Sequence, residues 1–245
     1  MEQLFAFSYL FRGLRVLNKP GVRLYVIIPL LINFIIFALL ISVGMSYFGG
    51  FQDWLMSYLG DGLWFIAWLL WIIFFLAALL IVFYTFSIIA NIIAAPFNSL
   101  LAEAVEYHLT GQTPPGSLMT AVKEFLPSLR AELSKLIYML LWSIPLLILF
   151  VIPGVNLIAP ILWFMFSGWM MGLQYLDYPF ANHGTFFSQQ RKQLGGHRIR
   201  TTSFGGGIMF ATMIPIVNFF VMPAAVAAAT ILWVERFADS SGEEE

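Results

Sequence analysis

Four long stretches of the 245-residue chain contain no charged side chain: residues 24–52, 62–102, 136–176 and 201–234. Uncharged apolar runs longer than about 18 residues are typical of membrane-embedded helices. Shorter segments that contain all of the charges separate these runs. The pattern predicts an all-α integral membrane protein that forms a single membrane domain over residues 1–245.

The first two runs predict two long transmembrane helices. At about 1.5 Å per residue, residues 24–46 are long enough to cross a hydrocarbon core about 30 Å thick. Residues 63–95 exceed that length, so this helix is expected to tilt, kink or project from the bilayer. The loop between the two helices carries only Asp53 and Asp61 as charged side chains.

Residues 97–135 mix charged and apolar side chains at helical spacing. This pattern favours two amphipathic helices that lie at the headgroup level or in the cytosol. Thr110, Gly111 and the Pro114–Pro115 pair are expected to divide them.

The last two runs share a motif, Ile-Pro-x-Val-Asn followed by a second proline, at residues 152–160 and 214–223. Proline removes a backbone donor and clashes with the preceding turn, so each motif is expected to divide its run into two arms. The arm at residues 204–214 reaches only about 16 Å at helical rise and cannot cross the core.

We therefore expect two re-entrant helical hairpins, at residues 136–176 and 204–235, packed together so that their irregular backbone is covered. Pro145 is expected to shorten the first arm of the earlier hairpin. An arrangement of six full spans is the alternative. Hairpins of partial depth need partners along their flanks, so we expect a homo-oligomer, at least a dimer.

Composition agrees with a membrane protein, since 60% of the residues are hydrophobic and only 10% are charged, against about 25% charged in a soluble domain. The chain has no cysteine, which excludes disulfides and thiol chemistry. The first apolar run follows four cations and lacks a small-residue cleavage pattern, so it is expected to remain in the mature protein.

The basic residues predict the orientation. With a cytoplasmic N-terminus, all twelve Lys and Arg residues fall on the cytoplasmic side in either arrangement, and the outward loop has none. This positive-inside asymmetry places both termini in the cytoplasm.

The segment at residues 1–23 ends in "FRGLRVLNKPGVR", which holds a third of the positive charge. Arg12, Arg15 and Lys19 follow one helical stripe, and Arg23 comes after the Pro20–Gly21 break. Anchoring to lipid headgroups explains such a cluster, and binding of a substrate anion is the alternative.

Several polar residues beside the apolar runs are candidates for an ion path or its coupling. Asn156 and Asn218 follow the motif prolines; they either bond the backbone at the tips or line a path, as broken helices do in transporters. Acidic side chains at Glu103, Glu106 and Asp177 either lie on solvated faces and in ion pairs between helices, or carry a proton that offsets the charge of an anion. Arg130 or Lys135 could partner them.

Other chemistry is not predicted. The three histidines lack the short spacing of helix-borne metal ligands, and the glycines at 205–207 do not continue into a P-loop. No nucleophile, base and orienting group come together, so neither an enzyme nor a cofactor is expected. The basic segment at residues 189–200 has no interleaved aromatics, which favours lipid headgroups or a cytosolic anion over nucleic acid.

Five stretches carry a resemblance to a known family. They are "GLR" at 13–15, "KPGVRLYVIIPLLIN" at 19–33, "IANIIAAPFNSLLAE" at 89–103, "YLDYPF" at 175–180 and "MIPIVNFFVMPAAVAAATILWVE" at 213–235. In this order and over this length, the chain resembles the CysZ sulfate-uptake proteins of the bacterial inner membrane. The resemblance implies uptake of sulfate for cysteine synthesis, described as proton-dependent. It also implies two long spanning helices with two helix pairs that enter only partway.

The resemblance also implies a sulfate site at Gly13, Leu14 and Arg15, with Arg12 as a weaker candidate. An arginine fork and free backbone N–H groups suit a dianion. Because a continuous helix would use the N–H groups of Gly13 and Leu14, this site predicts a break or helix start near Gly13. Arg23 is an interfacial anchor or a charge at the mouth of a pore.

The sequence thus favours a sulfate permease or channel, either passive or coupled to protons. The alternative is a non-transporting membrane adaptor that docks another protein through its half-inserted helices.

Overall fold

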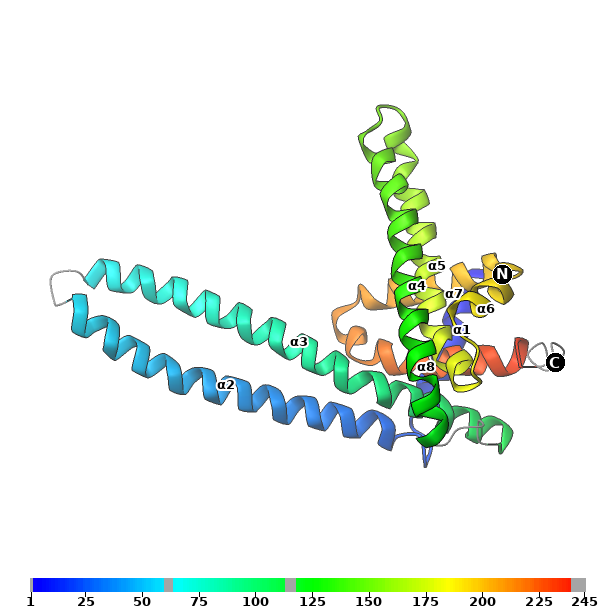
Figure 1. The fold of residues 1–245 in the computed structure, drawn as a ribbon, viewed down its shortest axis with the longest axis horizontal. Helices are drawn as coiled ribbons and strands as arrows, with labels where there is room; N and C mark the ends of the chain where they lie inside the picture. Colours follow the sequence, from blue (N-terminus) through cyan, green and yellow to red (C-terminus); the bar gives the residue numbers. More distant parts are fainter. Residues whose placement is uncertain (1, 60–63, 113–117, 239–245) are drawn as a thin grey trace. The chain divides into compact units, whose positions relative to one another are not determined.

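The computed structural model describes residues 2–59, 64–112 and 118–238. These residues form helices and no strand, as Figure 1 shows. The helices are α1 (Glu2–Leu17), α2 (Leu24–Leu59), α3 (Trp64–Thr110), α4 (Leu118–Val151), the short 3₁₀ helix η2 (Val155–Leu157), α5 (Ala159–Asn182), α6 (Phe187–Gly195), α7 (Arg198–Thr212) and α8 (Pro215–Arg236). The predicted all-helical class is confirmed.

Among the described residues, three helical segments are long and apolar enough to cross a membrane. They are Leu24–Phe51, Trp68–Phe86 and Pro127–Val151. The first extends five residues beyond the predicted helix at 24–46, and the second lies within the predicted helix at 63–95. The third begins in the predicted amphipathic segment at 97–135 and continues into the first arm of the earlier hairpin. The depth to which either hairpin enters the membrane stays a prediction.

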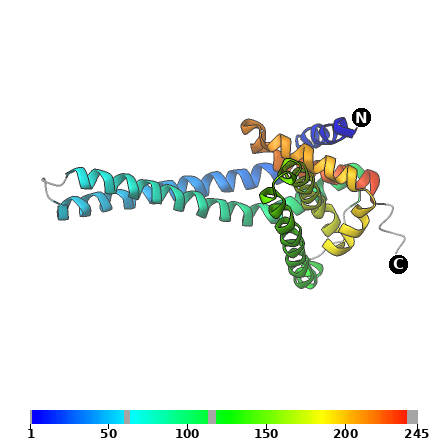
Figure 2. The ribbon, with the colours of Figure 1, turned by 90° about the horizontal axis from the view of Figure 1, so that it is seen from above.

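The chain divides into two compact units, residues 27–97 and the remainder. The first unit is a pair of helices, formed by α2 and α3, that lie side by side in Figures 1 and 2. Aromatic rings join them: Phe51 stacks on Phe74 with centroids 3.9 Å apart, and Phe37 lies 4.9 Å from Phe86. Most other large side chains of the pair are exposed, a surface that suits lipid rather than water.

Both helices of this pair are longer than predicted. α2 continues past residue 46 to Leu59, through Gly49 and Gly50, and α3 continues through Pro96 to Thr110. The glycine pair looked like the start of a loop, but a glycine inside a helix costs only about 1 kcal/mol, and the Phe51–Phe74 stack lies just beyond it. The predicted division at Pro114 and Pro115 lies outside the described residues.

The expectation that Pro145 shortens the first arm of the earlier hairpin is wrong. α4 continues through both Pro127 and Pro145, so the second amphipathic segment and the hairpin arm form one helix. A proline inside a helix removes one hydrogen bond and introduces a bend. In an apolar run the helix continues, because ending it would leave several more backbone groups without partners.

Both repeats of the Ile-Pro motif lie at turns between helices. α4 ends at Val151, and the chain turns through Gly154 and η2 into α5. α7 ends at Thr212, and Pro215 opens α8, where its missing N–H would have had no helical partner. Each motif therefore joins two helices, although its prolines take different positions in the two turns.

Small residues allow the helices of the larger unit to pack closely. A methyl group on Gly205 of α7 would collide with the backbone of Gly168 and Gly172 in α5. The run Ala224–Ala229 of α8 is buried throughout. Backbones that approach this closely gain van der Waals contact that larger side chains would prevent.

Gly205→Ala is therefore expected to lower the stability of the purified protein by about 1–3 kcal/mol, because the added methyl group meets backbone that cannot move aside. Gly49→Ala is the matched control inside a helix, since nothing lies within 4 Å of the position its Cβ would take. That control should be neutral or slightly stabilising. Thermal unfolding in detergent measures both, and equal unfolding temperatures for the two variants would contradict the close crossing.

Candidate functional site

The amino-terminal helix is continuous across the predicted anion site. α1 runs from Glu2 to Leu17 without interruption, so the predicted break near Gly13 is wrong. A Cβ on Gly13 would collide with the carbonyl oxygen of Ala224 and would lie 2.9 Å from the backbone nitrogen of Ala228. The glycine lets α1 pack against α8. Its N–H and that of Leu14 are used inside the helix and are not offered to an anion.

Arg12 is held by an acidic residue at the end of α8. Its Nη1 donates to Oε2 of Glu235 at 3.1 Å, and its Nη2 donates to Oε1. The hydroxyl of Tyr9 donates to the same carboxylate at 2.6 Å. The hydrogen bond from Arg12 lowers the pKa of Glu235 below its ordinary value. The fork of Arg12 is thus already occupied, and the pair ties α1 to α8.

The next three cations of the basic segment are exposed. Arg15, Lys19 and Arg23 have no acidic partner among the described residues. Lys19 and Arg23 lie in the turn between α1 and α2, where the N–H groups of Val22 and Arg23 donate to the carbonyl of Lys19 and Gly21 has a φ of 88°. Val22 is fully buried and anchors this turn. These three cations are the charges of the segment that remain available to an external anion.

Glu103 lies in a cavity beside this turn. The cavity has a volume of about 470 Å³, and its lining includes Pro20, Gly21 and Glu103. Burial, with a smaller contribution from the nearby Glu106, raises the pKa of Glu103. Glu106 itself is 2.9 Å from Nε2 of His183. The structure thus brings Glu103 close to the basic segment, which sequence spacing did not predict.

Asp177 is part of an ion pair between helices. Nζ of Lys135, on α4, donates to Asp177 on α5 and to Glu132, each at 2.8 Å. Lys135 is buried, whereas Arg130 is exposed and has no acidic partner in the described part of the chain. Of the two roles considered for Asp177, this geometry supports the structural one.

The structure does not bring the two motif asparagines together. Asn156 lies in the turn between α4 and α5, and Asn218 lies in the first turns of α8; both are exposed. Figure 1 shows the α4–α5 and α7–α8 turns pointing in different directions. No side-chain hydrogen bond to the turn backbone is present for either asparagine in the described ranges, so the structure does not show the expected tip-bonding role.

The long apolar helices, two of them paired with each other, define an integral membrane protein of the helical class. A family model described as Sulfate transporter CysZ/Etoposide-induced protein 2.4 matches residues 9–223. The chain belongs to this family, as the resemblance of its sequence had implied.

Individual relatives agree with this assignment. A Pectobacterium atrosepticum protein named sulfate transporter CysZ is 42% identical over 238 residues, which cover 95% of this chain and 86% of that protein. Proteins of the same name from Pseudomonas paraeruginosa and Pseudomonas aeruginosa are each 43% identical over 231 residues, or 94% of both chains. These relatives are named as transporters, in agreement with the expectation that the chain is not an enzyme.

The link between Arg12 and Glu235 should give a pH-dependent contribution to stability. Because the pair lowers the pKa of Glu235, its contribution is present above the ordinary glutamate pKa of about 4.3 and is lost as the pH falls through the lowered value. Glu235→Gln should therefore destabilise the protein at pH 7 by at most about 1 kcal/mol, since the pair is partly exposed. The difference from the unmodified chain should vanish in acid. Thermal unfolding in detergent across pH measures this, and a difference that grows in acid would contradict the assignment.

Proposed function

We propose that this chain carries sulfate across the bacterial inner membrane into the cytoplasm, where sulfate supplies sulfur for cysteine synthesis. Membership of a family whose relatives are named sulfate transporters supports the substrate. The observation that carries the proposal in the structure is the exposed group of Arg15, Lys19 and Arg23, which has no acidic partner among the described residues. A dianion requires positive charge that is not already neutralised.

Arg15 is the residue proposed to contact sulfate. An α-helix turns by about 100° per residue, so Arg15 lies roughly 200° around α1 from Gly13. Gly13 faces α8, and Arg15 therefore faces away from it. A guanidinium there offers a planar fork to an oxyanion. Gly13, Leu14 and Arg12 act by positioning α1, and Arg23 supplies charge at the entrance to the path.

The proposed orientation and assembly of the chain follow from its charge distribution and its exposed apolar surface. Both termini are cytoplasmic in the proposal, since this orientation keeps every Lys and Arg on the inner side. The exposed apolar side chains of α4 and α5 need lipid or protein against them. A homo-oligomer covers part of this surface, and in the proposal the sulfate path is completed by neighbouring copies that approach the motif turns with Asn156 and Asn218.

Glu103 is the residue proposed to couple uptake to protons. Its cavity borders the Pro20–Gly21 turn of the basic segment. A carboxyl with a raised pKa keeps its proton to higher pH than an ordinary glutamate and can release it to the cytoplasm. Asp177 and Arg130 are weaker candidates, because Asp177 already compensates Lys135 and Arg130 forms no ion pair among the described residues.

Arg15→Gln is expected to reduce sulfate flux into proteoliposomes that contain only this chain by at least about tenfold. The reason is that a hydrogen bond to a charged group contributes about 1.5–3 kcal/mol. Arg200→Gln is the control, since Arg200 is also exposed and lies on another helix, α7. Radiolabelled sulfate measures the flux. Equal flux from Arg15→Gln and the unmodified chain would remove Arg15 from the site, and no sulfate flux from the unmodified chain would favour an adaptor.

Glu103→Gln is expected to flatten the pH dependence of sulfate flux. In the unmodified chain, with the same pH on both sides of the membrane, flux should fall as that pH rises through the raised pKa of Glu103, because the carboxyl then loses the proton that it supplies. The amide cannot titrate. Glu132→Gln, which changes an exposed acid on α4, should keep the original profile. An unchanged profile for Glu103→Gln would exclude it from coupling.

A further inference from the structure

A large groove lies beside the α4–α5 helix pair. It has a volume of about 1000 Å³ and is lined by residues of α4, α5, α6 and α7. Three cations, Arg191, Lys192 and Arg198, line it together with aromatic and aliphatic side chains. Among its described lining residues there is no acid, so the three positive charges are not neutralised inside the groove.

The groove is divided into a polar end and an apolar wall. Tyr138, Trp142 and Leu146 follow one face of α4 at intervals of four residues and lead toward the turn with α5. Leu162 and Phe166 of α5 lie along the same wall. From Tyr138 to Leu146 the wall extends about 12 Å at helical rise.

Arg191 lies beside an aromatic pair. Nε1 of Trp169 donates to the hydroxyl of Tyr138 at 3.2 Å, and the guanidinium carbon of Arg191 lies 4.9 Å from the centre of the Tyr138 ring. Tyrosine and tryptophan concentrate at the boundary between hydrocarbon and headgroups. The aromatic pair beside Arg191 therefore favours a lipid headgroup at the basic end of the groove.

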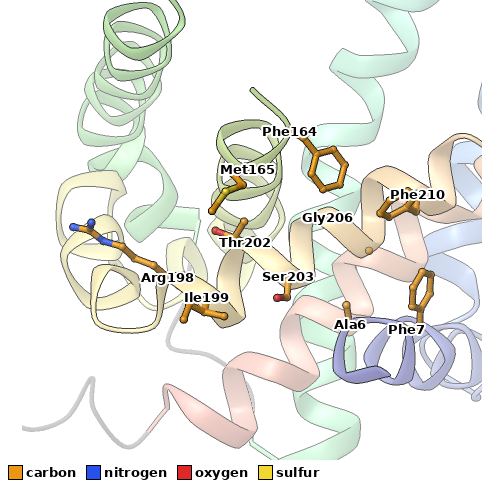
Figure 3. Close-up of a pocket in the computed structure, with 11 residues that line it drawn as sticks. Ala6, Phe7, Phe164, Met165, Arg198, Ile199, Thr202, Ser203, Gly206 and Phe210 are labelled. Carbon is orange, nitrogen blue, oxygen red and sulfur yellow. The ribbon is translucent and has the colours of Figure 1, made fainter. Parts of the chain in front are cut away.

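Arg198 also borders a second cavity, of about 440 Å³, between α1, α5 and α7. Figure 3 shows its side chain extending away from Phe7, Phe210 and Ala6, which line the apolar end of that cavity. Its charge is thus directed away from these apolar side chains. Lys192 and Arg198 have no acidic partner among the described residues.

We propose that this groove binds an anionic phospholipid, with its phosphate against Arg191, Lys192 and Arg198 and an acyl chain along the wall formed by Leu146, Leu162 and Phe166. Unpaired cations attract a phosphate, and the apolar wall is buried by a hydrocarbon chain. Free sulfate or phosphate can pair with the three cations, but it leaves the apolar wall of the groove exposed to solvent. The amphipathic groove thus selects an anion attached to an apolar chain.

Native mass spectrometry of the purified full-length chain tests this site with phosphatidylglycerol and with phosphatidylcholine of the same acyl chains. The anionic lipid should bind more tightly to the unmodified chain. Lys192→Gln with Arg198→Gln should weaken its binding by about 25-fold, since each basic residue near an anionic surface contributes about a factor of five. Arg191 is left in place because it packs on Tyr138 and Phe187.

The matched control compares two arginines on the same helix. Arg198→Gln alone should weaken binding of phosphatidylglycerol about fivefold, whereas Arg200→Gln, which makes the same charge change outside the groove lining, should leave it unchanged. Equal losses for the two variants would overturn the site in favour of a general surface charge effect. Equal binding of the two lipids by the unmodified chain would also overturn it.

A soluble competitor separates the lipid from a free anion. Millimolar inorganic sulfate or glycerol phosphate should displace little phosphatidylglycerol, because neither occupies the apolar wall. Displacement by either at its own binding concentration would overturn the proposal and assign the groove to a free oxyanion. The readout is lipid binding and requires no transport, so its failure is distinct from a failure of sulfate flux.

Discussion

The rest of the larger unit depends on the close approach of backbones where its helices cross. Gly205 of α7 lies against the backbone of α5, and Gly13 of α1 lies against the backbone of α8. At neither place is there room for a side chain. Since Ala224–Ala229 of α8 are buried as well, the helices contact one another at these crossings through main chain and methyl groups. Such contacts fix the rotation of each helix about its own axis, because only the face with the small residues can turn inward.

The fixed rotation of α1 decides what its charged residues can do. With Gly13 turned toward α8, Arg12 is positioned to reach Glu235, and Arg15 is turned outward. The same glycine cannot also begin a helix and offer its N–H to an anion, because the crossing requires a continuous helical backbone. The resemblance had implied a sulfate site in this stretch of sequence. Physical packing then assigns Gly13 a structural role and leaves the arginine side chain as the part that can meet sulfate.

Sequence patterns predicted the helical class and the turns at the Ile-Pro motifs, because absence of charge and the position of proline are local properties of the chain. The same patterns did not predict correctly where the helices end. Pro96, Pro127 and Pro145 all lie inside helices, where an apolar environment penalises free backbone groups more than it penalises a bend. The reach of α3 and α4 beyond their apolar cores was therefore underestimated.

In the candidate site, too, one contact could be predicted from the sequence and another could not. Lys135 and Asp177 border the two ends of one uncharged run, so two antiparallel helices bring them to the same level, and their pairing was among the alternatives that the sequence offered.

The bond between Arg12 and Glu235 joins residues 223 positions apart, and nothing in the spacing of either residue indicates it. Yet this bond separates Arg12 from Arg15. An anion that bound Arg12 would have to displace a carboxylate from both arms of its fork, whereas Arg15 exchanges only water for the anion. Two arginines of equal charge, three residues apart, are thus expected to differ in their capacity to bind sulfate, because among the described residues only Arg12 has an acidic partner.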